Sequence, residues 1–329
     1  MSDHLLPHLI PTDPALFFTK NDPADPRMGD LVGRGIEAVD EGSRVAIIGV
    51  PQDIGVARNG GRVGAAQAPD AIRAMFYRLT PFDLASQHSV RHGTVIDLGN
   101  IRCDGDLEEI HERLAEVVAG VCRRRLIPLV LGGGHDITYA AASGVHAVHG
   151  PLGVINFDAH LDVRRPNPLR NSGTSFRMLI EEGKLPPEQF VEFGIQSFAN
   201  AQTHSEWLQE RGGNIFSLES VRQEGFAHAL DQAYRIASTG GTRVYATLDI
   251  DGVRAADAPG VSATMPDGFA ASELLAAARL LGSSTATVAV DIVEVNPRFD
   301  RDNQTAKLAA HAMMRCIAGI GDRESAESG

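Results

Sequence analysis

Short runs of apolar residues alternate with polar, helix-like stretches along most of this chain. The first run covers residues 44–51 (RVAIIGVP), and seven more follow at residues 94–99, 127–132, 152–157, 190–195, 214–218, 243–250 and 286–295. Several runs are continuous in Val, Ile and Leu, as is typical of strands that are buried on both faces. The pattern therefore predicts about eight short strands in a parallel sheet.

The segments between these runs show helical periodicity. Residues 106–122 repeat Leu, Ile and Val three or four positions apart, and residues 303–320 repeat Ala and Met at the same spacing. This order predicts an α/β fold, three-layer and doubly wound, with a mainly parallel sheet. We expect one domain over residues 41–322, an irregular N-terminal extension of residues 1–40, and a C-terminal tail of residues 323–329.

Composition narrows the class of protein. The formal net charge of -12 argues against a nucleic-acid partner, because phosphate binding needs basic patches. No apolar run is long enough to cross a membrane, and the first residues lack the basic start and apolar core of a signal peptide. The three cysteines are scattered, which indicates reduced thiols in a cytoplasmic protein.

Acids and histidines gather where three of the predicted strands end. They are His135 in LVLGGGHD, Asp158, His160 and Asp162 in VINFDAHLD, and Asp249 and Asp251 in TLDIDGV. In sheets of this kind, ligands bind beyond the carboxyl ends of the strands. Alternate positions of an extended chain point to the same side, so we expect each motif to converge if the chain stays extended there.

Four carboxylates this close repel one another unless a counter-charge is present, and two divalent cations neutralise four negative charges. A DxD after a strand is common without metal, and a GGGH turn alone is compatible with an ordinary hydrogen-bonded histidine. Burying DxHxD together with the other two motifs without metal is costly, so we favour a site for two metal ions. Oxygen donors outnumber nitrogen donors and no cysteine is present, which favours Mn²⁺ over Zn²⁺.

The motifs GGGHD, NFDAHLD and LDIDGV, followed by DIVEVNP at residues 291–297, resemble those of the ureohydrolase family of arginases, agmatinases and formimidoylglutamases. This resemblance implies an arginase-like fold and two Mn²⁺ ions that share a hydroxide. It implies that one ion is held by His135, Asp158, Asp162 and Asp249, and the other by Asp158, His160, Asp249 and Asp251. Glu294 matches the acid that faces the amidine or guanidine group, where charge-assisted hydrogen bonds suit a planar cation.

Other stretches resemble the formimidoylglutamase branch in particular. They are residues 49–76, with an RNGGRVGA loop before the APDAIR helix, residues 297–310, and Ser172-Gly173-Thr174. Arginases and agmatinases commonly have a histidine, acting as a proton shuttle, where this chain has Ser172. We therefore hypothesise that the proton for the departing amine is relayed from the hydroxide through Asp251.

The resemblance implies N-formimidoyl-L-glutamate as the small-molecule substrate, cleaved to L-glutamate and formamide in histidine degradation. Arg58 and Arg62 suit a dicarboxylate through bidentate bonds, with Asn171 and Ser172 as further substrate contacts.

Alternatives are another guanidino hydrolase, a non-catalytic ureohydrolase-like subunit and a two-metal phosphoesterase. The complete set of metal ligands argues against a non-catalytic subunit. Glu294 argues against a phosphoesterase, because a carboxylate would repel a phosphate. By resemblance we expect a homo-oligomer, a trimer or hexamer.

Overall fold

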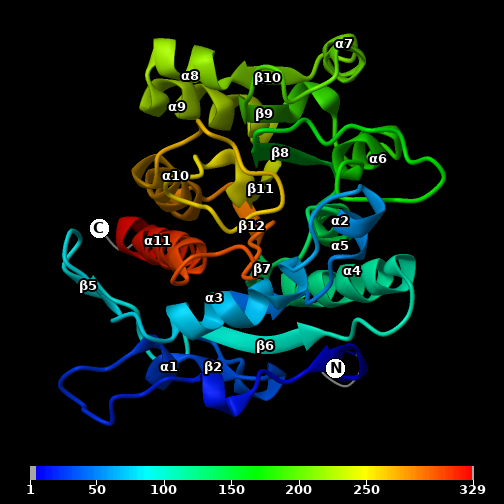
Figure 1. The fold of residues 1–329 in the computed structure, drawn as a ribbon. Coiled ribbons are helices and arrows are strands. Elements are labelled where there is room, and N and C mark those ends of the chain that lie inside the picture. Colours follow the sequence, from blue (N-terminus) through cyan, green and yellow to red (C-terminus); the bar gives the residue numbers. More distant parts are fainter. Residues whose placement is uncertain (1–4, 328–329) are drawn as a thin grey trace.

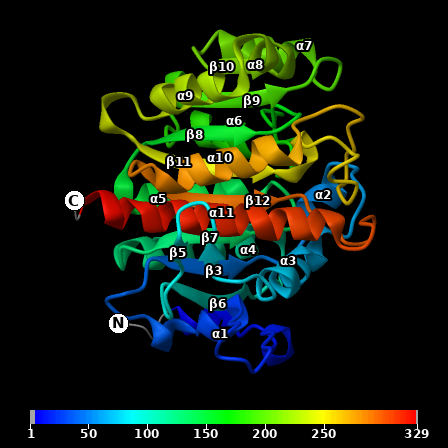
Figure 2. The ribbon, with the colours of Figure 1, turned by 90° about the vertical axis from the view of Figure 1, so that its left-hand side faces the viewer.

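A twisted sheet of ten strands runs through the centre of the protein, and helices cover both of its faces (Figures 1 and 2). The computed structural model describes residues 5–327, with side chains up to Arg323. The strands of this sheet are β1 (Leu9–Ile10), β2 (Gly33–Arg34), β3 (Val45–Gly49), β6 (Val95–Ile101), β7 (Ile127–Leu131), β8 (Leu152–Phe157), β9 (Phe190–Ile195), β10 (Asn214–Ser217), β11 (Arg243–Asp249) and β12 (Thr287–Val293). All eight expected strands are present, and the two additional ones, β1 and β2, contain two residues each.

The strand order across the sheet is β1-β6-β3-β7-β12-β11-β8-β9-β10, and β2 also pairs with β6. Apart from the antiparallel pair of β1 and β6, neighbouring strands run parallel. The last strand in the chain, β12, lies between β7 and β11 in the middle of the sheet. Strands β4 (Phe82–Asp83) and β5 (His88–Ser89) form a separate hairpin.

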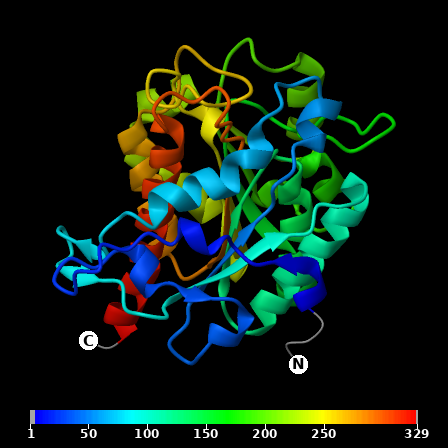
Figure 3. The same ribbon diagram turned by 60° about the horizontal axis from the view of Figure 1, so that its bottom comes forward.

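The helices divide into two layers, one on each side of the sheet (Figure 3). One layer contains α3 (Ala68–Phe76), α8 (Leu218–Glu224), α9 (Phe226–Ala237), α10 (Ala271–Ser283) and α11 (Gln304–Glu327). The other contains α4 (Leu107–Arg123), α5 (Ile137–His149), α6 (Ser175–Glu181) and α7 (Gln202–Gln209). The short helix α1 (Met28–Leu31) lies between β1 and β2, and the short helix α2 (Ile54–Arg58) follows β3.

Alternating side chains of the central strands fill two separate hydrophobic cores. Val45 and Ile47 of β3 belong to the core under α3 and α11, whereas Ala46 and Ile48 belong to the core under α4 and α5. Successive residues of a strand point to opposite faces, so a strand with helices on both sides needs apolar residues at every position. The expected three-layer α/β fold with a mainly parallel sheet is confirmed.

The two ends of the chain differ from the expected irregular extension and tail. Residues 5–40 include β1 and β2, which pair with β6, and Leu5 and Met28 are completely buried. At the other end, α11 continues to Glu327, so most of the expected tail is helical. Residues 1–4 and 328–329 lie outside the described part. No helix in residues 5–327 has the length and hydropathy that crossing a bilayer requires.

Candidate dinuclear metal centre

Four strands that are neighbours in the sheet present the predicted site residues at their carboxyl ends. In spatial order they are β7, β12, β11 and β8. The residues that follow or end them are His135 after β7, Glu294 after β12, Asp249 and Asp251 at β11, and Asp158, His160 and Asp162 after β8. The sheet therefore collects all of these residues, which span about half of the sequence, at one edge.

A glycine turn lets His135 follow β7 directly. A side chain at Gly133 would place its Cβ atom 1.6 Å from the carbonyl oxygen of Gln52, so the two backbone segments touch there. Only glycine permits this approach. The turn leads straight into α5, and His135 is almost completely buried between the turn and the ends of β8 and β11.

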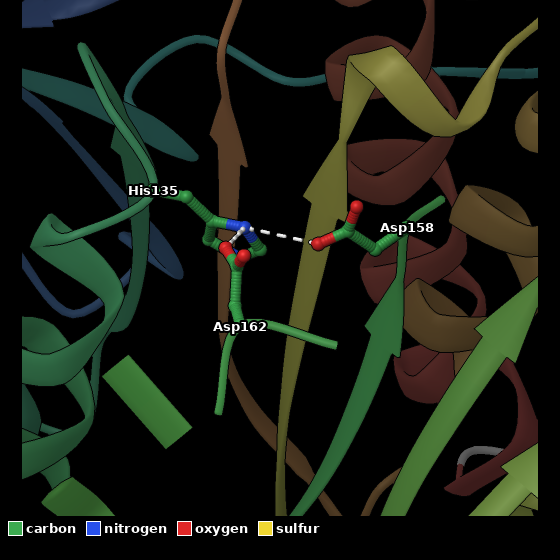
Figure 4. A group of neighbouring side chains, drawn as sticks. All are labelled: His135, Asp158 and Asp162. Carbon is green, nitrogen blue, oxygen red and sulfur yellow. Dashed lines mark ion pairs between the residues drawn. The ribbon is translucent and has the colours of Figure 1, made fainter. Parts of the chain in front are cut away.

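Three carboxylates surround the Nδ1 atom of His135. It lies 3.2 Å from Oδ2 of Asp158, 3.0 Å from Oδ2 of Asp162 and 3.0 Å from Oδ2 of Asp249. Figure 4 shows the Asp158 and Asp162 side chains pointing toward this histidine from the same connection after β8. Nitrogen and oxygen donors of this kind are typical ligands of a divalent transition metal.

A second group of donors adjoins the first. The Nδ1 atom of His160 lies 3.4 Å from Oδ1 of Asp158 and 3.3 Å from Oδ2 of Asp251. Asp158 belongs to both groups, with one oxygen facing each histidine. The two groups of donors are adjacent and share the carboxylate of Asp158. The shared oxygen pair comes from Asp158, whereas Asp249 contacts only His135 of the two histidines.

The condition of an extended chain after β8 is not met, although the side chains still converge. Strand β8 ends at Phe157, and the following residues form bends. Asp162 has a φ angle of 45°, in the left-handed region that non-glycine residues seldom adopt. This turn, and not strand alternation, brings the Asp162 carboxylate back to His135. Backbone conformations of this kind cluster at functional sites, where the surrounding structure holds them.

Two buried polar atoms of the cluster lack a hydrogen-bond partner among the described residues, as is common where a bound cation is absent. Nδ1 of His135 and Oδ1 of Asp251 have no hydrogen bond within the described part of the chain. The other ring nitrogen of His135 is 3.0 Å from Oγ1 of Thr247. When Nε2–H donates to this hydroxyl, Nδ1 turns a lone pair toward three carboxylates, which is favourable only with a cation between them.

The cluster holds more negative charge than its own histidines balance. Burial, followed by the charges of Asp251 and Asp158, raises the pKa of Asp249 well above its usual range. Burial also raises the pKa of Asp251 to about 6. For His160, the charge of Asp251 is the main cause that raises its pKa. Raised pKa values of this kind mean that bound protons offset part of the negative charge, which a metal ion would do in their place.

Glu294 closes the side of the site next to β12. Its Oε1 atom accepts a hydrogen bond of 2.9 Å from the backbone N–H of His135, and its φ angle is 63°. Burial, followed by the charge of Asp251, raises its pKa to about 8. The residue is buried and held in a left-handed conformation, so its carboxylate has a fixed position beside the metal ligands.

Several supporting residues were not predicted. Thr247 contacts His135, and the side-chain amide of Asn156 donates to Oδ2 of Asp158 at 3.2 Å and to Oε2 of buried Glu192 at 2.8 Å. Thr247 and Asn156 each stand two positions before a ligand in the same strand, so strand alternation places them on the ligand's face. This two-residue spacing in the sequence could have identified both supporting residues. Glu192, in β9, has no metal-binding candidate at such a spacing, so the sequence did not identify it.

Ser172 lies in the connection between β8 and α6 and is buried. Its hydroxyl accepts a hydrogen bond of 3.0 Å from the side chain of Asn59, and its N–H donates to the carbonyl of Gly55. Asn171 supports the same turn, since its side-chain oxygen accepts from the N–H of Gly173 at 2.9 Å. These contacts join the connection after β8 to the connection after β3.

The side chains of Arg58 and Arg62, which were predicted to bind the substrate, contact other groups of the protein. Arg58 donates to both carboxylate oxygens of Glu108, at 3.0 and 3.2 Å. Arg62 donates to the carbonyl oxygens of Ser262 and Val261, and its guanidinium lies 4.1 Å from the centre of the Phe299 ring. The structure thus brings the metal-binding candidates and Glu294 together, whereas Arg58 pairs with Glu108 of α4 and Arg62 contacts the segment at residues 261 and 262.

Comparison with known proteins places these features in a family. The arginase family matches residues 43–319. The formimidoylglutamase of Geobacillus thermodenitrificans is 38% identical over 280 residues, covering 83% of each chain. The formimidoylglutamase of Aeromonas hydrophila is 32% identical over 93% of this chain and 98% of its own. The crystal structure of Trypanosoma cruzi formiminoglutamase with Mn²⁺ superimposes with a TM-score of 0.85 at 32% identity, covering 91% of this chain and 99% of that chain. The protein belongs to the arginase family.

Proposed function

We propose that this protein is a dinuclear manganese hydrolase that cleaves a C–N bond of an amidino compound. His135, Asp158, Asp162 and Asp249 would hold one Mn²⁺ ion, and Asp158, His160, Asp249 and Asp251 the other. Two bound metal ions would supply positive charge that lowers the pKa of water and polarises an electrophile. The observation that carries the proposal is Asp158, whose two oxygens face two different histidines.

We infer that the substrate is N-formimidoyl-L-glutamate, which water converts to L-glutamate and formamide. Support comes from the relatives named as formimidoylglutamases, which match most of this chain. Glu294 would hold the planar amidinium through charge-assisted hydrogen bonds, because one of its oxygens is already fixed by His135. Asn171 and Ser172 would lie along the remainder of the substrate.

The protein's own groups also suggest a route for the proton that the departing amine needs. Oδ2 of Asp251 faces His160 and would be the metal-binding oxygen, so the buried Oδ1, which lacks a hydrogen-bond partner in the described residues, would be left to receive and pass on a proton. The Ser172 hydroxyl already accepts from Asn59. We therefore keep Asp251 as the proposed relay and Ser172 as a binding residue.

Another guanidino hydrolase is the second candidate, since the amidine-binding half of the site is common to both reactions. The test is a panel assay of Mn²⁺-loaded protein with N-formimidoyl-L-glutamate, arginine, agmatine and guanidino acids. We expect formamide release from the first substrate and no urea above background from the others. Urea from arginine or agmatine without formamide would reject the substrate assignment. No turnover of any substrate, with two Mn²⁺ bound, would favour a non-catalytic subunit.

The raised pKa values predict how metal removal changes stability with pH. The pKa of Glu294 is raised to about 8 and that of Asp251 to about 6, from the usual values near 4. Between those limits the folded state binds more protons than the unfolded state, so stability falls as pH rises. The raised pKa of His160 acts in the same direction above about pH 6.5.

We therefore expect protein treated with a chelator to melt at a lower temperature at pH 8 than at pH 5.5. Mn²⁺ should reduce or reverse this difference, because the metal replaces the protons. Calorimetric melting at both pH values, with and without metal, measures the effect. A metal-free protein that becomes more stable toward pH 8 would contradict the proposed charge state of the cluster.

We also propose a cytoplasmic location and a homo-oligomeric state. All three cysteines are free, which supports a reducing compartment. The oligomeric state rests on the resemblance to the family, and light scattering of the purified protein tests it.

A further inference from the structure

Four buried polar side chains form a row across the sheet, beneath the metal ligands. In the strand register, Asp291 of β12 lies beside Thr247 of β11, Thr247 beside Asn156 of β8, and Asn156 beside Glu192 of β9. Each of the four is completely buried. The positions two residues earlier in the same strands belong to an apolar core: Ala289, Tyr245, Val154 and Phe190. Buried polar groups cost free energy unless they make hydrogen bonds, so the row needs an explanation.

The two oxygens of Asp158 are held by different groups. We call the group of His135, Asp158 and Asp162 the first metal position, and the group of Asp158, His160 and Asp251 the second. Oδ1 of Asp158, on the side of the second position, accepts a hydrogen bond of 2.7 Å from the backbone N–H of His160. Oδ2, which faces His135 at the first position, accepts one of 3.2 Å from the side-chain amide of Asn156. The direction of Oδ2 therefore depends on a side chain, whereas that of Oδ1 depends on the backbone.

Glu192 holds the amide of Asn156 in place. The same amide nitrogen donates to Oε2 of Glu192 at 2.8 Å. An amide nitrogen carries two hydrogens, and here each hydrogen has a carboxyl oxygen as its acceptor. Rotation of the amide would turn its oxygen toward Asp158 and break the contact with Oδ2. The pairing of β8 with β9 sets Asn156 opposite Glu192, so the sheet itself fixes this arrangement.

The contacts of Glu192 favour a role in the site over a role in stability. Its other oxygen, Oε1, is buried and has no hydrogen-bond partner in the described residues. A buried acid with so few hydrogen bonds costs free energy of folding. Burial also raises the pKa of Glu192 well above its usual range, so near neutral pH the side chain adds little charge to the cluster. What it contributes is the hydrogen bond with Asn156.

We propose that Glu192 is a positioning residue, which acts through Asn156 to direct one oxygen of Asp158 toward the first metal position. The second position does not depend on Glu192 in this way, because the backbone of His160 holds the other oxygen. Partners that orient a metal ligand typically change metal affinity by about 10- to 100-fold. This inference rests on the metal centre of the proposed function and is independent of the substrate.

The test is titration calorimetry of metal-free protein with Mn²⁺. Glu192→Leu removes the acceptor, and we expect the affinity of one position to fall about 10- to 100-fold while the other changes by less than about threefold. Glu192→Gln retains an oxygen that can accept from Asn156, so both affinities should stay within about threefold. Val117→Ala is a control for lost stability, because Val117 is buried in α4 and does not belong to the row. Its melting temperature should fall without any change in Mn²⁺ binding.

Electron paramagnetic resonance shows which position is lost. Two adjacent Mn²⁺ ions couple magnetically, whereas a single bound ion gives the hyperfine lines of an isolated centre. With just enough Mn²⁺ to fill both positions of the unchanged protein, Glu192→Leu should give the isolated spectrum and Glu192→Gln the coupled one. The spectrum of Glu192→Leu should match that of Asp162→Asn, which alters the first position. A match with Asp251→Asn would place the loss at the second position and overturn the inference.

Asn156→Val and the double variant Asn156→Val/Glu192→Leu test whether Glu192 acts through Asn156. Replacing both partners by apolar residues leaves neither of them unpaired, so the double variant should fold even if Glu192→Leu alone does not. Asn156→Val should itself weaken the first position. Adding Glu192→Leu should then change the affinity by less than about threefold, because the link is already broken. A further large loss, or an unchanged affinity in Asn156→Val, would overturn the inference.

The remaining outcomes separate this inference from the proposed function. If the unchanged protein bound two Mn²⁺ ions and Glu192→Leu bound them equally well, the inference alone would fail. Equal losses at both positions, or the same loss in Glu192→Gln as in Glu192→Leu, would also overturn it. If the unchanged protein bound no Mn²⁺, the proposed function would fail and the inference with it.

Discussion

Replacing Asp158 by asparagine is expected to reduce bound Mn²⁺ from two ions per chain to at most one and to lower kcat by about 10³-fold or more. The reason is geometric, since the two oxygens of Asp158 face the two different histidines His135 and His160. Loss of several kcal/mol of transition-state stabilisation by metal corresponds to about this factor. Metal analysis after gel filtration and steady-state kinetics measure the two effects.

A control for this substitution is Asp267→Asn. Asp267 lies in the same part of the sequence as the β11 ligands, but it is exposed and pairs with Arg222. Metal content and kcat should therefore stay at the level of the unchanged protein. If Asp158→Asn retained two Mn²⁺ ions with full activity, Asp158 would have no bridging role. Asp162→Asn and Asp251→Asn, which each alter one group of donors, should each weaken one metal position.

Replacing Glu294 by glutamine is expected to lower kcat/KM by about 10²- to 10³-fold while two Mn²⁺ ions stay bound. The change removes the negative charge that would pair with the amidinium, and preorganised charges at reacting groups have effects of this size. A glutamine oxygen can still accept the hydrogen bond from the N–H of His135, so the fold should be retained. Kinetics and metal analysis of the same preparation separate the two contributions.

The metal measurement is the decisive part of this experiment. If Glu294→Gln lost metal along with activity, the residue would support the metal cluster and not the substrate. Unchanged kcat/KM would remove it from the site altogether. Because Glu294 has a left-handed backbone conformation, Glu294→Ala is a poorer variant, as it also removes the hydrogen bond to His135.

Much of the site was predictable because each motif lies at the end of a long apolar run. His135, Asp158 and Asp249 follow or end strands whose continuous hydrophobicity marks them as central. Thr247 and Asn156 were within reach of the same reasoning, because they stand two residues before ligands. The route of the chain between Asp158 and Asp162 was not predictable, since the left-handed turn at Asp162 depends on what surrounds it.

Arg58 and Arg62 show that the sequence around a residue does not reveal the partners of its side chain. Arg58 and Arg62 stand in the connection that was expected to reach the site, and nothing nearby in sequence indicated their partners. Those partners, Glu108 and the carbonyl oxygens of residues 261 and 262, are 50 and about 200 positions away.

The amino-acid sequence by itself determined the fold class and the kinds of donor atom in this protein. Apolar runs dictate strands that must be covered on both faces, and the acids and histidines at their ends dictate a cation site. The tertiary structure alone decided that β12, the last strand, lies between β7 and β11, because hydrogen bonding and helix packing act between segments far apart in the chain. That insertion places Glu294 against His135, and loop packing decided which arginines already have partners.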